Sequence, residues 1–262
     1  MARVFGTTLV LSLAVTLGAP FLAEANDLCG EPIFVNLRLD HDLTCVGDGL
    51  IVGADGIRLD LNGHTIAGSG SGVGISVIGR TNVSISGGIV RNFEAGVRVL
   101  NSTSIVVKEN QFLENGDGID LQAGSVGNTI KENEFWDNRT RGIMLRGATS
   151  NNVIKENTFT GNRVGILVFG AVDTTVKENI VSSSSLAGIR VNIIATRNLI
   201  MENTVTSNPA GIDFIVTPAG SATGNTFVEN TIAMNNCGLK GPIGGNTFEE
   251  NVFQGNGADS CP

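Results

Sequence analysis

A repeat of about 22 residues constrains the fold of this chain more than any other feature. The dipeptide Gly-Ile, in which Val or Leu can replace Ile, recurs at intervals of 18 to 27 residues and begins at Gly56, Gly74, Gly96, Gly118, Gly142, Gly165, Gly188, Gly211 and Gly238. A second marker, an apolar residue followed by any residue and then Glu-Asn, recurs from Val107 to Asn251 at intervals of 21 to 27 residues. Because two independent markers keep one period, we interpret the chain as a stack of similar units.

Each unit contains short β-branched segments separated by Gly, Asn and Ser, which is typical of strands and turns. Leucine-rich repeats have a similar period but need regularly spaced Leu, which this chain lacks, and helical repeats are longer. Stacking the units as coils about 4.8 Å apart would pair each strand with its equivalents in the coils above and below. The sequence therefore predicts an all-β parallel β-helix, a single-stranded solenoid of about nine coils.

Stacked coils place equivalent residues in vertical files. An inward apolar file is predicted two residues past each repeated Asn, at Phe112, Phe135, Phe159, Val181, Val205, Ile232 and Phe253. The apolar residue of each Gly-Ile pair forms a second file. We expect the repeated Asn residues at turns, where Asn tolerates left-handed backbone and can hydrogen-bond its copy in the next coil.

The first 25 residues differ from the rest of the chain. Arg3 precedes an apolar run from Leu9 to Leu17, and Ala23-Glu24-Ala25 presents small residues at a cleavage site before Asn26. We predict a signal peptide at 1–25 and one β-helix domain at 26–262. The apolar run is too short to span a bilayer, so we predict no membrane insertion and a secreted or periplasmic protein.

Four cysteines fit an oxidising compartment. Cys29 and Cys45 fall at one end of a rod of about nine coils, about 40 Å long, and Cys237 and Cys261 fall at the other. A disulfide requires Cα atoms about 4–7 Å apart, which excludes pairing across the rod. We predict disulfides Cys29–Cys45 and Cys237–Cys261, each of which would staple an end coil.

The formal net charge of −8 makes nucleic acid an unfavourable partner, because an acidic protein repels the phosphate backbone. The sequence does not determine an oligomeric state.

The segments Asp60-Leu61-Asn62-Gly63-His64-Thr65-Ile66 and Asn82-Val83-Ser84-Ile85-Ser86-Gly87-Gly88-Ile89-Val90, followed by Gly-Ile coils with Asn turns, resemble secreted proteins of the pectin-lyase-like superfamily. The resemblance covers about residues 48–256 and points to the NosD-type or carbohydrate-binding and sugar-hydrolase repeat subgroup. It implies a right-handed parallel β-helix. That subgroup contains polysaccharide lyases, epimerases and binding proteins, so the resemblance implies polysaccharide as the class of partner.

Active sites in this superfamily commonly lie in a groove on one exposed sheet. The first outward file predicted on the Gly-Ile strands is Arg58, Ser76, Arg98, Asp120, Met144, Leu167, Arg190 and Asp213, and the next is Asp60, Ile78, Leu100, Gln122, Arg146, Phe169, Asn192 and Ile215. Uronate lyases need a cation to neutralise the sugar carboxylate and a base to remove the α-proton. Arg98, Arg146 and Arg190 with Asp120 and Asp213 are therefore the catalytic candidates. The alternative interpretation is that these arginines and aspartates form ion pairs between adjacent coils.

A file of glutamates precedes the repeated asparagines. Lysine precedes the first four glutamates, whereas Glu202, Glu229 and Glu250 follow Met201, Val228 and Glu249. Because hard cations prefer oxygen ligands, we predict a Ca²⁺ site at Glu202, Glu229 and Glu250, against the alternative of a solvated acidic edge. Trp136 is the single Trp of a chain without Tyr, and we consider it as a lone sugar platform against the alternative of surface packing.

Catalytic motifs of known relatives are missing, including Gly-His-Gly, Asn-Thr-Asp and Asp-Pro-His-Glu. Two histidines and four cysteines expected in disulfides also supply few ligands for copper. We therefore predict a secreted β-helix that binds polysaccharide or another cell-surface partner. The alternatives are a lyase or epimerase acting on acidic polysaccharide, and a structural or adhesive rod without a ligand site.

Overall fold

A computed structural model describes residues 28–192, 194–215 and 222–262. The predicted signal peptide at 1–25 lies outside the described residues and stays a prediction. Within the described part of the chain, no helix is long and apolar enough to cross a membrane.

The described residues form three parallel sheets of 11, 10 and 10 strands, each built from every third strand of the chain. Sheet A contains β1 (Pro32–Ile33), β4 (Leu50–Val52), β7 (Val73–Ile78), β10 (Ala95–Leu100), β13 (Asp117–Leu121), β16 (Arg141–Arg146), β19 (Val164–Phe169), β22 (Ala187–Val191), β25 (Ala210–Phe214), β28 (Cys237–Lys240) and β31 (Ala258–Cys261). Sheet B contains β2 (Leu37–Arg38), β5 (Arg58–Asp60), β8 (Ser84–Ser86), β11 (Val106–Lys108), β14 (Thr129–Lys131), β17 (Val153–Lys155), β20 (Thr175–Lys177), β23 (Leu199–Met201), β26 (Thr226–Val228) and β29 (Thr247–Glu249). Sheet C contains β3 (Leu43–Thr44), β6 (Thr65–Ala67), β9 (Ile89–Arg91), β12 (Gln111–Leu113), β15 (Glu134–Trp136), β18 (Thr158–Thr160), β21 (Ile180–Ser182), β24 (Thr204–Thr206), β27 (Thr231–Ala233) and β30 (Val252–Gln254).

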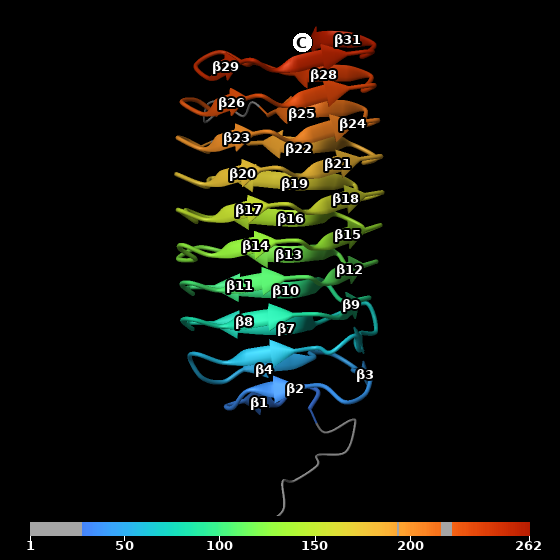
Figure 1. Cartoon of the computed structure of the whole chain (residues 1–262), viewed down its shortest axis with the longest axis vertical. Coiled ribbons are helices and arrows are strands. Elements are labelled where there is room, and N and C mark those ends of the chain that lie inside the picture. The colour runs from blue at the N-terminus through green and yellow to red at the C-terminus, as the bar shows by residue number, and fades with distance from the viewer. Residues whose placement is uncertain (1–27, 193, 216–221) are drawn as a thin grey trace, which may run out of the picture.

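The strands stack as successive coils of one rod, with the N-terminal coils at one end and the C-terminal coils at the other (Figure 1). The predicted right-handed parallel β-helix is thereby confirmed. The predicted number of about nine coils is slightly low, because the end strands β1 and β31 lack the Gly-Ile marker.

Both predicted apolar files are confirmed. Ile119 pairs in register with Val97 and Ile143, and all three side chains are fully buried. The rings of Phe112 and Phe135 stack with centroids 5.1 Å apart, and those of Phe135 and Phe159 with centroids 4.6 Å apart.

The repeated glycines of sheet A serve this packing. A Cβ atom added to Gly118 would lie 2.6 Å from Cδ1 of Phe135 and 2.6 Å from the carbonyl oxygen of Gly142. The equivalent atom on Gly142 would lie 2.4 Å from Cδ1 of Phe159. Sheet A therefore uses Gly at this position because the apolar file of sheet C packs directly against its backbone.

The expected asparagine ladder is confirmed between sheets B and C, where Nδ2 of each Asn donates to Oδ1 of its copy in the next coil at 2.8–3.2 Å. The expectation of left-handed backbone at Asn is wrong: the preceding glutamate has the positive φ, for example 57° at Glu156. That arrangement turns the following Asn side chain inward, where Asn157 is 1% exposed.

Two further Asn ladders were not predicted. One contains Asn115, Asn138 and Asn162 and, beyond Ser184, Asn208, Asn235 and Asn256. The other contains Asn128 and Asn152 and, beyond Thr174, Asn198, Asn225 and Asn246. In several coils asparagines recur every five residues, for example Asn128, Asn133 and Asn138, and this spacing is the signal that could have revealed them.

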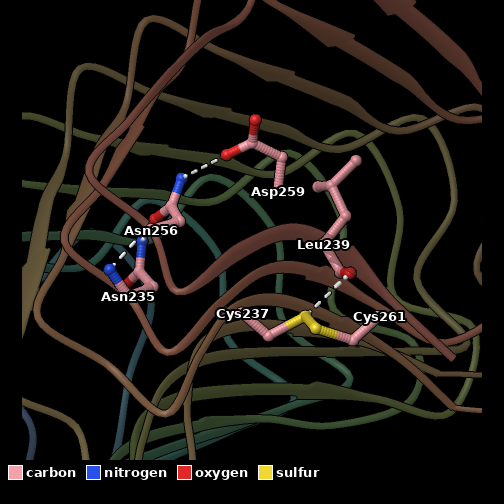
Figure 2. The surroundings of a disulfide bond; sticks show 6 residues. All are labelled: Asn235, Cys237, Leu239, Asn256, Asp259 and Cys261. Carbon is pink, nitrogen blue, oxygen red and sulfur yellow. Dashed lines mark hydrogen bonds between the residues drawn. A yellow bond between two sulfur atoms is a disulfide. The ribbon is translucent and has the colours of Figure 1, made fainter.

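Both predicted disulfides are present, Cys29–Cys45 near the N-terminal end and Cys237–Cys261 near the C-terminal end. Cys237 and Cys261 lie on neighbouring strands β28 and β31, beside the last asparagines of one ladder, Asn235 and Asn256 (Figure 2). A covalent link thus ties the last strand of sheet A to the strand beneath it.

Candidate functional site

The predicted outward file lies on sheet A from Ser76 onward. Arg98 pairs in register with Ser76 and Asp120, and Arg190 pairs in register with Leu167 and Asp213.

The placement of Arg58 and Asp60 in the two outward files is wrong, because both lie on strand β5 of sheet B. The sheet A equivalent of Gly74 is Gly49, since Leu50 pairs with Ile75. The unusually short interval from Gly56 to Gly74 was the sign of the misassignment.

Asp120 is the centre of a charge cluster on sheet A. Its side chain is 2% exposed and accepts hydrogen bonds from Arg98 Nε at 3.4 Å, from Arg146 Nε and Nη2 at 3.1 and 2.9 Å, and from Gln122 Nε2 at 2.6 Å. Arg98 also reaches Glu94, with Nη2 3.3 Å from Oε1. The buried carboxylate thus clamps two guanidinium groups from the strands on either side of β13, and these groups stay 23% and 42% exposed.

A second ion pair lies beside this cluster. Arg141 Nη1 lies 3.2 Å from Asp117 Oδ1, which also accepts a short hydrogen bond from the Thr140 hydroxyl. Burial raises the pKa of Asp117 above its usual value, although the bonds from Thr140 and Arg141 oppose the rise. Sequence reasoning missed Asp117 and Arg141, which both directly precede a marker glycine, Gly118 and Gly142.

A further ion pair of sheet A joins Arg190 Nε to Asp213 Oδ2 at 2.9 Å, with the Asp213 side chain 7% exposed. The sequence-based alternative of ion pairs between adjacent coils is therefore what the structure shows for Arg98 with Asp120 and for Arg190 with Asp213. Sheet A brings Arg98, Asp120 and Arg146 together in one cluster.

Apolar side chains separate the charged groups along the file. Met144 and Leu167 lie in register between Asp120 and Arg190. A hollow of about 280 Å³ lies at the end of these strands and is lined by Gln122, Ala123, Arg146, Gly147 and Phe169. In this hollow the guanidinium group of Arg146 and the ring of Phe169 face the same space.

Trp136 lies elsewhere, on strand β15 of sheet C. Its side chain is 40% exposed, and its Nε1 donates to Glu134 Oε2 at 3.1 Å. Its role as a sugar platform stays a prediction, separate from the sheet A cluster.

The glutamate file is neutralised where lysine precedes it. Lys131 Nζ donates to Glu132 Oε1 at 2.9 Å, and this bond raises the pKa of Lys131 and lowers the pKa of Glu132. The same pairing occurs at Lys108, Lys155 and Lys177, with distances of 3.0, 3.2 and 3.3 Å to the adjacent glutamate.

Metal ligands are sparse in the described chain. Among residues 28–192, 194–215 and 222–262, no three His, Cys, Asp or Glu side chains gather in a way that could hold a metal ion. Glu202, Glu229 and Glu250 therefore form no preformed cluster, and Ca²⁺ binding there stays a prediction.

Comparison of the sequence with known protein families gives a match. The sequence matches the family described as "Periplasmic copper-binding protein (NosD)" over residues 45–209 and again over 147–259. The chain belongs to this family. No curated protein matches the chain.

Solved structures share the β-helix with this NosD-family chain at low sequence identity. An alginate lyase from Paenibacillus sp. str. FPU-7 has a TM-score of 0.65 and 16% identity, and the match covers 84% of this chain and 98% of the lyase. The periplasmic alginate epimerase AlgG has a TM-score of 0.65 and 14% identity over 81% of this chain and 62% of the epimerase. The tailspike of E. coli bacteriophage HK620, in complex with a pentasaccharide, has a TM-score of 0.66 and 12% identity over 88% of this chain and 52% of the tailspike.

The described residues of this NosD-family chain do not fit a copper site. Proteins bind copper through His, Cys and Met. All four cysteines are in disulfides, His64 Nδ1 lies 3.2 Å from Asp42 Oδ1, and His41 pairs with Asp40. Among the described residues no three His, Cys, Asp or Glu side chains gather in a way that could hold a metal ion, and Met144, Met201 and Met234 lie in different coils, so this part of the chain offers no counterpart to the copper-binding description of the family.

Proposed function

We propose that the protein binds an acidic polysaccharide on the exposed face of sheet A, in a compartment outside the cytoplasm. Two disulfides and the periplasmic description of the family support that compartment. Neighbouring folds named as an alginate lyase, an alginate epimerase and a pentasaccharide-bound tailspike support a polysaccharide as the class of partner.

The guanidinium pair around Asp120 carries this proposal. Arg98 and Arg146 are held in place by a buried acid yet remain partly exposed. A guanidinium group has five N–H donors, so donors remain after the bonds to Asp120 and can meet a sugar carboxylate. Phe169 lies on the adjacent strand, is half-buried and lines the hollow, so its ring offers apolar surface for the C–H face of a sugar ring.

The same cluster favours binding over proton transfer. Asp120 is 2% exposed and already accepts hydrogen bonds from Arg98, Arg146 and Gln122, so it is poorly placed to remove a proton from a substrate.

A second candidate function, a lyase or epimerase on acidic polysaccharide, is favoured by Asp117 alone. Burial raises its pKa above the usual value, and this is the direction that favours a carboxyl acting as a general acid. Absorbance from unsaturated uronates, or a changed ratio of uronate epimers in NMR spectra of alginate, would move this function ahead, and the absence of both would leave the binding function as proposed.

The binding test compares two arginine variants by titration calorimetry with alginate oligosaccharides. Arg146→Gln removes a sheet A guanidinium, whereas Arg197→Gln removes an exposed guanidinium that pairs with Asp173 outside sheet A. We expect Arg146→Gln to weaken binding about tenfold or more, since a charge-assisted hydrogen bond contributes about 1.5–3 kcal/mol. Arg197→Gln should leave affinity nearly unchanged.

Equal effects of the two variants, or equally tight binding of a neutral cello-oligosaccharide, would contradict the proposal. No binding to any acidic glycan, together with trimers in light scattering, would support the structural rod instead.

A further inference from the structure

A groove follows a single coil across sheet B. Its central hollow, about 500 Å³, is lined by Arg58, Asp60, Ser84, Ser86, Val106 and Lys108. A neighbouring hollow of about 360 Å³ shares Arg58, Ser84 and Val106 with it and continues past Asn82. A third hollow of about 300 Å³ lies beside Gly87, Gly88 and Ile89. Together the three hollows follow residues 82–89 from sheet B round the turn toward sheet C.

Short side chains in this coil create the groove. Ser86 pairs in register with Lys108, so Ser86-Gly87-Gly88 stands where the next coils have Lys-Glu-Asn. The coil that contains residues 82–89 therefore lacks the lysine and the glutamate side chains that the next four coils present to solvent. Strands on both sides keep long side chains, so the floor lies between two walls about 10 Å apart, twice the strand spacing.

The walls carry both charges and the floor carries hydroxyl groups. On the first wall Arg58 stands beside Asp60, whose Oδ2 lies 3.3 Å from Arg38 Nε. Arg58 lies in register below Ser84 and is exposed, and among the described residues no carboxylate forms an ion pair with it. Lys108 stands on the other wall, with Nζ 3.0 Å from Glu109 Oε1 and its side chain 34% exposed. Ser84 and Ser86 supply hydroxyls that can donate and accept hydrogen bonds.

We propose that this groove is a second binding site for an acidic polysaccharide, with a sugar carboxylate between Arg58 and Lys108 and sugar hydroxyls on Ser84 and Ser86. The inference takes its class of ligand from the proposed function, but its site is a different sheet and different residues. Strand β8 is paired on both sides, by β5 and β11, so a peptide cannot occupy the groove by adding a strand. An open, hydroxyl-lined floor suits a hydrated chain of acidic sugars, because Arg58 can bind a sugar carboxylate while Asp60 can accept hydrogen bonds from sugar hydroxyls.

The test introduces into the groove the residue types that occupy the equivalent positions of the next coils. The double variant Ser86→Lys with Gly87→Glu reproduces the Lys-Glu of the next coils and leaves net charge unchanged. Gly87 has φ of 77° and the equivalent Glu109 has φ of 56°, so the backbone accommodates Glu, and an added Cβ would meet nothing closer than 3.6 Å. Met201→Lys, which places a lysine at the equivalent position of a distant coil, is the matched control.

Alginate hexasaccharide is titrated into each full-chain variant by calorimetry, and backbone amide shifts are followed by NMR. Wild type should bind two hexasaccharides and shift the amides of both 82–89 and sheet A. The double variant should lose the shifts at 82–89 and keep those of sheet A, and Arg58→Gln should weaken the groove site about tenfold. Met201→Lys should behave as wild type.

Unchanged amides at 82–89 in wild type, or unaltered binding in the double variant, would overturn the groove site while leaving the sheet A site untouched. The reverse pattern, with shifts at 82–89 and none on sheet A, would keep the groove and refute the proposed function at sheet A.

Discussion

Asn157 in the central ladder tests how much of the stability of the rod rests on buried amides. Its Nδ2 donates to the carbonyl oxygens of Ile130 and Lys155 at 3.0 and 2.9 Å and to Asn179 Oδ1 at 3.0 Å. Its Oδ1 accepts from the backbone N–H and the Nδ2 of Asn133 at 3.0 and 3.1 Å. The side chain is 1% exposed, so water cannot replace these partners.

Asn157→Ala removes the acceptor of the buried backbone N–H and Nδ2 of Asn133, and it removes a donor from the buried oxygens of Ile130 and Asn179; the Lys155 oxygen keeps the N–H of Glu132. A buried polar group left unpaired costs about 1–3 kcal/mol, so we expect the free energy of unfolding to fall by about 3–5 kcal/mol. Asn157→Asp should cost at least as much, because a carboxylate keeps the acceptor but cannot donate and stands against Asn179 Oδ1.

Asn251, in the last coil of the same ladder, is the matched control. It accepts from Asn230 and donates to the carbonyl of Phe227, but it is partly exposed, so solvent can satisfy part of what Ala removes. We expect Asn251→Ala to cost about 1 kcal/mol. Urea denaturation followed by far-UV circular dichroism measures both variants. A loss below about 1 kcal/mol at Asn157, or equal losses at the two positions, would refute the reasoning.

Two further predictions concern packing and pH. Gly118→Ala should lower the free energy of unfolding by about 1–3 kcal/mol in urea denaturation, because its Cβ would overlap Phe135, whereas Gly244→Ala, with nothing within 4 Å, should change it by less than about 0.5 kcal/mol. Burial raises the pKa of Asp117 above 3.8, so the folded state holds that proton more tightly than the unfolded state and ionisation opposes folding. Asp117→Asn should therefore lose less stability than wild type as pH rises through and above 3.8. Asp173→Asn should lose less stability than wild type as pH falls through and below 3.8. The hydrogen bond from Arg197 lowers the pKa of Asp173, so wild type loses this contribution to stability when acid protonates the carboxylate. If urea midpoints at several pH values gave parallel curves for wild type and both variants, this assignment of pKa directions would be wrong.

The periodicity alone predicted the parallel β-helix, the Phe file, one Asn ladder and both disulfides. A stacked coil repeats its environment, so each position needs the same kind of residue again, and the period becomes visible in the chain. The error at Gly56 arose because a Gly-Ile pair also occurs before a sheet B strand, where the same dipeptide serves a different turn.

The candidate site was predicted only in part. Arg98, Arg146 and Asp120 were selected, and Gln122 was placed in the outward file without a role. The ion pair of Asp117 with Arg141 and the groove along Ser84 and Ser86 were missed. A groove made by short residues has no motif of its own, since it is defined by the longer side chains on the coils either side of it.

The sequence by itself determined the architecture of this protein, because identical coils can bury their apolar faces only by stacking. The tertiary structure alone decided that Arg98 and Arg146, from two different coils, converge on one buried carboxylate. The repeat period predicts which residues share a file. Which carboxylate a long side chain reaches on a neighbouring strand depends on burial and on the size of the adjacent side chains.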